Sequence, residues 1–198
     1  MANLMKQSIF IDRIKAKKLA LFSKRDIQVL FKTSETSAIF LLYRYNKNGI
    51  ILKIKRGLYC LKDTVPPEVY LSSKLYTPSY ISREFALSYH GIIPETVYEI
   101  TAVTTKTTRI FKTLKTVYSY RHIKKTAFTG YELKKQNGYT FYIADIEKAF
   151  ADTLYYALLF DKKHIERFNK EKINKRKTLA YAKLFNNQKL IDIVNKLL

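Results

Sequence analysis

The sequence is short of cysteine, of long apolar runs and of acidic residues. Cys60 is the only cysteine among 198 residues, which excludes an internal disulfide and a cysteine cluster for zinc. No run of about 18 apolar residues is present, and the opening MANLMKQSIF lacks an apolar signal core. These absences predict a cytoplasmic protein that has no membrane span and no membrane partner.

The shortage of acid leaves a strongly basic chain. Asp and Glu number 16 against 37 Lys and Arg, so the formal net charge is +21 and the pI is near 9.9. Such an excess makes an anionic partner the first expectation, nucleic acid before an anionic membrane surface. A generally Lys-rich composition is the alternative explanation of the charge. Apolar residues reach 47%, which is enough for a packed core.

Catalytic motifs are also absent. The sequence has no Walker loop, no GxSxG and no GxGxxG, and its histidines lack the spacing of metal ligands: His90, His122 and His164. Glu147 and Asp152 are five residues apart, which places them on different faces of a helix. We therefore expect no enzyme activity, no cofactor and no metal. A nucleic-acid enzyme that uses Glu147, Asp152 or His122 is a disfavoured alternative.

The stretch from Thr33 to Leu61 changes its hydrophobic period once. Helical spacing over its first half places these residues on one face: Ala38, Leu41, Leu42 and Tyr45. Ser34 or Thr33 can cap the start of this helix, and Asn48-Gly49 ends it. Alternation then predicts a strand in which Ile50, Leu52 and Ile54 face opposite to Ile51, Lys53 and Lys55. Arg56-Gly57 is a tight turn into a returning strand, Leu58 to Leu61.

Two further helices precede this stretch, over residues 9–18 and after the N-cap Ser23, and only Lys32-Thr33 separates the second from the third. Three helices followed by a hairpin predict a winged helix-turn-helix over residues 1–63, which hold 14 Lys and Arg against 4 Asp and Glu, a net +10. Asp63 to Pro67 contains two prolines and reads as a linker.

Residues 64–198 predict a second domain of mixed α/β type, so the whole chain is of the α+β class. Helices are expected over 67–76, from the cap Ser82 to Gly91 and over 145–160, and strands over 98–104, 109–112, 117–123, 128–133 and 139–143 in a mainly antiparallel sheet. The tail from Lys162 to Leu198 predicts two or three further helices with solvated basic faces.

Candidate DNA contacts lie off the core face of the third helix and around the hairpin turn. Hydroxyls near a helix N-terminus can donate to phosphate, Arg44 or Lys47 can reach phosphate or guanine, and basic residues at the turn can reach phosphate. The set is Thr33, Ser34, Thr36, Ser37, Arg44, Lys47, Lys53, Lys55 and Arg56. An ordinary solvated face is the alternative for the three hairpin residues.

A second basic feature covers the predicted strands, because no Asp or Glu occurs between Ile100 and Tyr131. Its basic residues are Lys106, Arg109, Lys112, Lys115, Arg121, Lys124 and Lys125. With Tyr118 and Tyr120 interleaved, it can form a second nucleic-acid surface or a docking face for an acidic protein. A sheet edge protected by Lys against aggregation is an equal alternative.

Several phrases together resemble the AbiEi-type antitoxins of bacterial type IV toxin–antitoxin (abortive infection) systems. These phrases are Arg56-Gly57-Leu58-Tyr59, Tyr80-Ile81-Ser82, residues 86–95 (ALSYHGIIPE), residues 101–104 (TAVT), residues 118–123 (YSYRHI), residues 128–131 (FTGY), Ile143-Ala144, Glu147-Lys148-Ala149 and Asp152. Their order and spacing carry the resemblance over Phe22 to Tyr156.

This resemblance implies a non-enzymatic antitoxin. Its winged helix would bind inverted repeats in double-stranded DNA at its own promoter and repress its operon, with both domains contributing. The C-terminal domain would counter a nucleotidyltransferase-like toxin without a stable complex. The alternatives are a stand-alone winged-helix regulator and a protein-binding antitoxin that docks its toxin through the basic β face.

Overall fold

The structure, a computed structural model, describes residues 6–161 and 165–198. The chain divides into two compact units, Met1–Pro67 and Glu68–Leu198. This division falls at the end of the proline-containing linker, four residues beyond the predicted boundary at Asp63. His164 and the predicted start of the tail helices at Lys162 lie outside the described residues.

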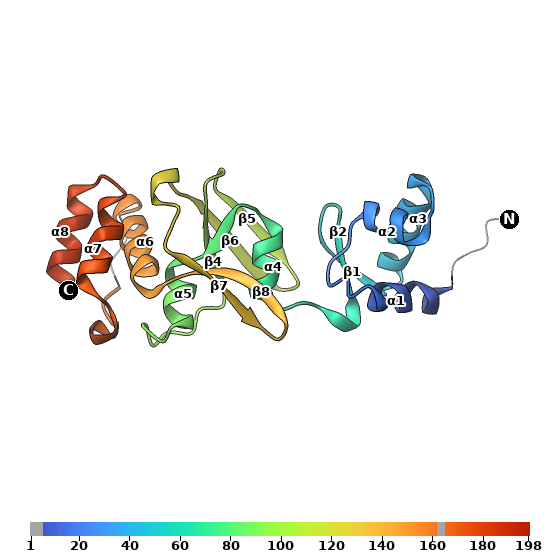
Figure 1. Cartoon of the computed structure of the whole chain (residues 1–198), viewed down its shortest axis with the longest axis horizontal. Coiled ribbons are helices and arrows are strands. Elements are labelled where there is room, and N and C mark those ends of the chain that lie inside the picture. Colours follow the sequence, from blue (N-terminus) through green and yellow to red (C-terminus); the bar gives the residue numbers. More distant parts are fainter. Residues whose placement is uncertain (1–5, 162–164) are drawn as a thin grey trace. The chain divides into compact units, whose positions relative to one another are not determined.

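The first unit consists of three helices and a two-stranded antiparallel hairpin (Figure 1). Its elements are α1 (Gln7–Ala16), α2 (Lys24–Phe31), α3 (Glu35–Lys47), β1 (Ile51–Lys55) and β2 (Leu58–Leu61). Ser23 and Asp26 form a reciprocal capping box at the start of α2, and Ser34 caps α3. Lys32 ends α2 in the left-handed conformation, which makes the connection to α3 very short. The second and third helices therefore start where the sequence predicts, whereas α1 begins and ends two residues before the predicted range 9–18.

Aromatic rings form the centre of this unit. Phe10 of α1 stacks on Phe31 of α2 at 5.4 Å between ring centroids and meets Tyr45 of α3 at 4.5 Å. Phe22 meets Phe10 edge-on, and its backbone forms an isolated bridge with Tyr59 of β2. One aromatic cluster thus fixes the three helices and the hairpin relative to one another.

The hairpin departs from the predicted alternation. Ile51 and Ile54 are the buried residues of β1, whereas Leu52 is half-buried. The register shifts between Lys53 and Lys55, because Lys53 pairs with Tyr59 and Lys55 with Leu58. This irregularity rotates the strand by one residue, so the strict alternation of Ile50, Leu52 and Ile54 with Ile51, Lys53 and Lys55 does not hold along β1.

The second unit contains a six-stranded sheet in the order β5-β6-β4-β3-β8-β7 (Figure 1). The strands are β3 (Ser79–Ile81), β4 (Ile100–Thr104), β5 (Arg109–Thr113), β6 (Thr116–His122), β7 (Tyr131–Gln136) and β8 (Tyr139–Ala144). Pairs β3–β4, β5–β6 and β7–β8 are antiparallel, and β3–β8 and β4–β6 are parallel. The sheet is mixed, and the chain is of the α+β class.

The sheet differs from the prediction in two details. The short strand Ser79–Ile81 lies at the centre of the sheet and is missing from the predicted strands, although the helix that follows it does have its N-cap at Ser82. β7 begins at Tyr131 instead of Phe128, because Lys125–Ala127 is a 3-10 turn and Gly130 has φ +73°. A side chain at Gly130 would also lie 2.7 Å from the Tyr181 ring, so this approach requires glycine.

The helices of the second unit are α4 (Glu68–Leu75), α5 (Arg83–Tyr89), α6 (Ile146–Leu159), α7 (Lys175–Lys183) and α8 (Gln188–Leu197). Figure 1 shows α6, α7 and α8 gathered beside the sheet, and α6 contacts α5, α7, α8 and β8. This surrounding buries α6 on both sides, including its charged residues Lys148 and Asp152. The 3-10 turns Lys62–Thr64 and Lys170–Lys172 complete the described elements.

Lys148 and Asp152 form a fully buried ion pair one turn apart on α6. Ser82 Oγ donates to the other carboxylate oxygen of Asp152 at 2.6 Å, and Tyr80 Oη donates to it at 3.3 Å. The Lys148 ammonium also lies 4.7 Å from the centroid of the Phe185 ring. Burial raises the pKa of Asp152 above its ordinary value, and the neighbouring Lys148 opposes this shift. The network joins β3 to α6 through charged hydrogen bonds.

Candidate nucleic-acid interface

The outward face of α3 carries four exposed residues spaced one helical turn apart. Thr36, Phe40, Tyr43 and Lys47 recur at intervals of three and four residues, opposite the buried Ala38. Phe40 is 71% exposed and Tyr43 is 64% exposed, which is unusual for large rings. The helix therefore presents a mixed aromatic, hydroxyl and basic stripe to solvent.

A groove of about 370 Å³ runs between this helix and the hairpin. Ile39, Tyr43 and Asn46 line it from α3, and Lys53 and Gly57 line it from the hairpin. Lys24, which forms an ion pair with Glu35, closes it from the start of α2. The groove connects the α3 stripe to the basic turn of the hairpin within one folded unit.

The predicted DNA contacts do not all lie on this surface. Thr36, Lys47, Lys53 and Arg56 are exposed, whereas Thr33 and Lys55 are half-buried. Arg44 lies on the flank of α3, where its guanidinium donates to Tyr45 Oη at 3.2 Å and covers the Tyr45 ring.

Ser34 and Ser37 are engaged with each other. Ser34 Oγ accepts from the Ser37 amide at 3.2 Å and donates to Ser37 Oγ at 3.0 Å. These hydroxyls therefore stabilise the start of α3, which is the ordinary role of serine at an N-cap.

The predicted contact set omits several residues of this surface, among them Ile39, Phe40 and Tyr43. A helical projection that starts from the buried Ala38 and Leu42 places Phe40 and Tyr43 on the same exposed face as Thr36 and Lys47. Helical spacing alone could therefore have assigned the two rings to this surface. The predicted set favoured hydrogen-bonding side chains, although an exposed ring can contact the thymine methyl group.

The basic residues of the second unit do not form one face. Arg109 and Lys112 are three residues apart in β5, so they point to opposite sides of the sheet. Arg121 is half-buried, with its guanidinium 4.9 Å from the centroid of the Phe160 ring. The other members are exposed: Lys106, Lys115, Lys124 and Lys125.

Tyr118 and Tyr120 are fully buried in β6, which lies between β5 and β4. Tyr120 Oη donates to the Ser72 carbonyl at 2.7 Å, and burial raises its pKa above the ordinary value. These rings are not available for stacking with a base. The aromatic residues interleaved in this part of the sequence belong to the core, and the predicted stacking surface on these strands is wrong.

Groups for metal or acid–base chemistry stay apart in the described part of the chain. No group of three or more His, Cys, Asp or Glu side chains there is placed to hold a metal ion. His90 Nε2 lies 2.8 Å from the Ala144 carbonyl, and His122 Nδ1 lies 3.1 Å from the Lys106 carbonyl. Glu147 accepts from the Asn174 amide and pairs with Lys177, and no hydrogen bond or ion pair is found between the described residues Glu147 and Asp152.

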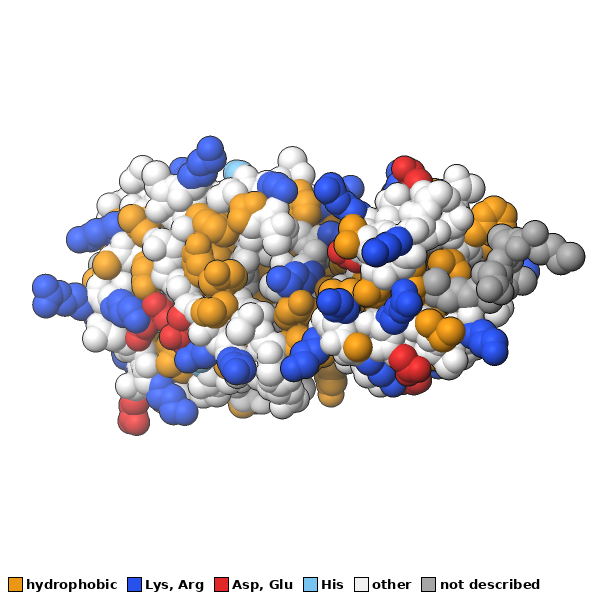
Figure 2. Space-filling model, turned by 45° about the vertical axis from the view of Figure 1, so that its right-hand side comes forward, with side chains coloured by type: hydrophobic (Ala, Val, Ile, Leu, Met, Phe, Trp, Pro, Cys, Tyr) orange, Lys and Arg blue, Asp and Glu red, His pale blue; other side chains and the backbone are white. Residues whose placement is uncertain are grey.

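In the surface view of Figure 2, blue Lys and Arg side chains are spread over both units and outnumber the red acidic groups. Within the described residues, every helix is too short or too polar to cross a membrane. No protein-family model matches the chain, and no curated protein matches it either.

Proposed function

We propose that the chain is a sequence-specific, DNA-binding autorepressor that acts as the antitoxin of a type IV toxin–antitoxin system. The observation that carries the DNA-binding part is the groove in which the outward face of α3 meets the basic turn of β1 and β2. Residues 1–63 form its surroundings and have a net charge of +10. A helix beside a basic hairpin is the arrangement of a winged helix-turn-helix.

In this proposal α3 enters the major groove. Thr36 and Lys47 contact phosphate or base edges, and the rings of Phe40 and Tyr43 contact thymine methyl groups, which makes binding sequence-dependent. Lys53 and Arg56 contact phosphate from the hairpin, which fixes the register on the duplex without reading sequence.

The antitoxin part rests on the resemblance of residues 22–156 to the AbiEi-type family. Most of the phrases that carry it lie in the second unit, Glu68–Leu198, so we assign toxin neutralisation to that unit. The toxin would be nucleotidyltransferase-like and would be countered without a stable complex. The protein itself would act without a metal, a cofactor or catalysis.

A gel-shift with the DNA upstream of its own gene tests the DNA-binding part. We expect binding to an inverted repeat there that weakens steeply as salt rises, and no comparable affinity for a scrambled repeat. Equal affinity for the two duplexes would mean that binding depends only on general attraction to phosphate. It would overturn the assignment of sequence-specific binding. A nucleotidyltransferase-like gene beside its own gene tests the antitoxin part.

Exposed basic residues at the β5 edge favour one second candidate, an antitoxin that docks an acidic protein. The Lys106 ammonium lies 5.5 Å and the Arg109 guanidinium 5.9 Å from the centroid of the Tyr76 ring. The adjacent Ile110 is 54% exposed. Such a basic and apolar edge suits a protein partner. Co-purification with the product of the neighbouring gene, lost in the variant Arg109→Glu, would favour docking.

A further inference from the structure

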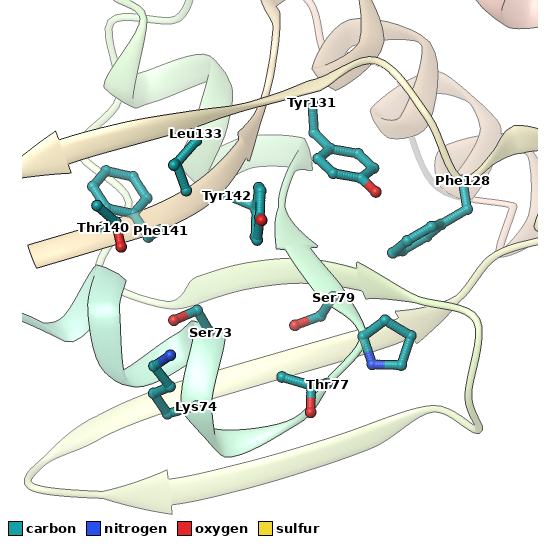
Figure 3. Close-up of a pocket in the computed structure, with 11 residues that line it drawn as sticks. Ser73, Lys74, Thr77, Ser79, Phe128, Tyr131, Leu133, Thr140, Phe141 and Tyr142 are labelled. Atoms are coloured by element: carbon teal, nitrogen blue, oxygen red, sulfur yellow. The ribbon is translucent and has the colours of Figure 1, made fainter.

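The β7–β8 hairpin and the end of α4 enclose a groove of about 510 Å³ in the second unit (Figure 3). Its wall on one side comes from α4 and the start of β3, and on the other from the two hairpin strands and Phe128. The groove is separate from the α3 surface, because all its lining residues belong to Glu68–Leu198.

Exposed aromatic and apolar side chains form one row along this groove. Leu133 pairs with Tyr142 in the strand register and Tyr131 with Ala144, so these three side chains share one face of the hairpin. Leu133 is 57% exposed, Tyr142 46% and Tyr131 37%. In Figure 3 their side chains lie along the same side of the groove, with Phe128 at its end.

Packing against a buried ring fixes this row of side chains in place. The Tyr131 ring stacks on the buried Tyr80 at 4.5 Å and 20° and meets Tyr142 edge-on at 5.5 Å and 82°. Tyr80 is itself fixed by its hydrogen bond to the buried Asp152. An exposed ring that is already ordered loses little conformational entropy when a flat ligand stacks on it.

The polar groups of the groove suit an anionic ligand. Among the described residues that line the groove, Lys74 is the only charged one and none is acidic. Lys135 pairs with Thr140 in the register, which places it on the same face as Tyr142 and Leu133. Glu132 points to the opposite face of β7 and pairs with Lys134 at 2.7 Å. The wall formed by the end of α4 and the start of β3 carries the hydroxyls of Ser73, Thr77 and Ser79, so it is polar, which suits an apolar peptide poorly.

We propose that this groove binds single-stranded nucleic acid. One or two unpaired bases stack on Tyr142 and Tyr131, and the adjoining phosphates lie near Lys74 and Lys135. A duplex is excluded as the ligand, because its bases are stacked on one another and its faces are not available. RNA and DNA offer the same bases and phosphates, so the two are separated by experiment.

The chain contains no tryptophan, which gives a direct test of stacking. The variant Tyr142→Trp places a single fluorescent reporter in the groove, and Tyr98→Trp places one at a tyrosine that is 84% exposed elsewhere. On titration of the full-length chain with an eight-nucleotide RNA or DNA, we expect saturable quenching at position 142 only. Equal quenching at both positions, or none at 142, would overturn the proposal.

Affinity gives a second, independent readout. With excess unlabelled duplex present, Tyr142→Ala should weaken binding of a labelled single strand by between about 5-fold and 150-fold, the range for loss of one stacked base. Tyr98→Ala should stay within about twofold of the wild type, and circular dichroism checks that both variants fold. A single strand bound as tightly by Tyr142→Ala as by the wild type contradicts the proposal.

The same variant separates this groove from the α3 surface. Binding of Tyr142→Ala to a duplex inverted repeat should match the wild type, because none of the groove residues belongs to the first unit. A change in sedimentation with protein concentration that Tyr142→Ala abolishes would assign the groove to a second copy of the chain and overturn nucleic-acid binding there.

Discussion

The buried pair Lys148 and Asp152 allows a sharp prediction at the residue scale. Asp152→Ala leaves a buried ammonium without its partner, so the free energy of unfolding should fall by about 3–5 kcal/mol. The double variant Lys148→Met with Asp152→Leu removes both charges and should lose less than the single variant. Urea unfolding measures all three. As a control, Glu132→Ala breaks an exposed pair and should cost below about 1 kcal/mol.

Cys60 gives a second prediction at this scale. Its side chain is fully buried, and this burial raises the pKa of the thiol from 9.0 to about 11. The reactive thiolate is therefore scarce at pH 8, and a disulfide reagent should label the folded chain slowly. In urea the thiol returns to its ordinary pKa, and labelling should become fast. Rapid labelling of the folded chain at pH 8 would contradict the buried position.

The same residues show what the sequence could not reveal. Lys148 and Asp152 lie on the side of α6 away from its apolar stripe, so periodicity predicts that they are solvated. They are buried because α5 covers one side of α6 while α7 and α8 cover another. Tyr118 and Tyr120 are interleaved with basic residues, which left a stacking surface open as one alternative, and they too are buried. The local spacing of apolar residues does not reveal burial that is caused by an element distant in the sequence.

At the scale of elements, the hairpin β1–β2 carries the most direct test of the DNA interface. Lys53 and Arg56 are exposed, and Lys53 lines the groove beside α3. Lys53→Ala with Arg56→Ala should weaken binding to all duplexes alike and reduce the slope of log affinity against log salt by about 2. Filter binding at several salt concentrations measures this.

A matched control comes from the second unit. Lys112→Ala with Lys115→Ala removes two exposed charges outside the α3 surface and should leave the salt slope within about 0.5 of the wild type. If the two double variants reduce the slope equally, then the hairpin makes no specific contact with phosphate.

Elements were predicted most accurately where local signals are strong. Ser23 and Ser34 each cap the helix that the sequence assigns to them, and Asn48 ends the third helix as expected. The strand Ser79–Ile81 was missed because three residues are too few for a period. The groove at β7 was missed as well, because Ser73 of α4 and Tyr142 of β8 are brought together only by the sheet order.

At the scale of the whole molecule, the division into two compact units predicts that two activities can be separated. Lys53→Ala with Arg56→Ala should raise expression from the protein's own promoter several-fold in a reporter strain, because phosphate contacts are lost. The same variant, expressed from an unrelated promoter, should still protect cells from the neighbouring toxin at the wild-type level. Protection depends in our proposal on Glu68–Leu198, which contains neither residue. Loss of protection together with repression would show that neutralisation requires the α3 surface, and it would contradict the assignment of the two activities to separate units.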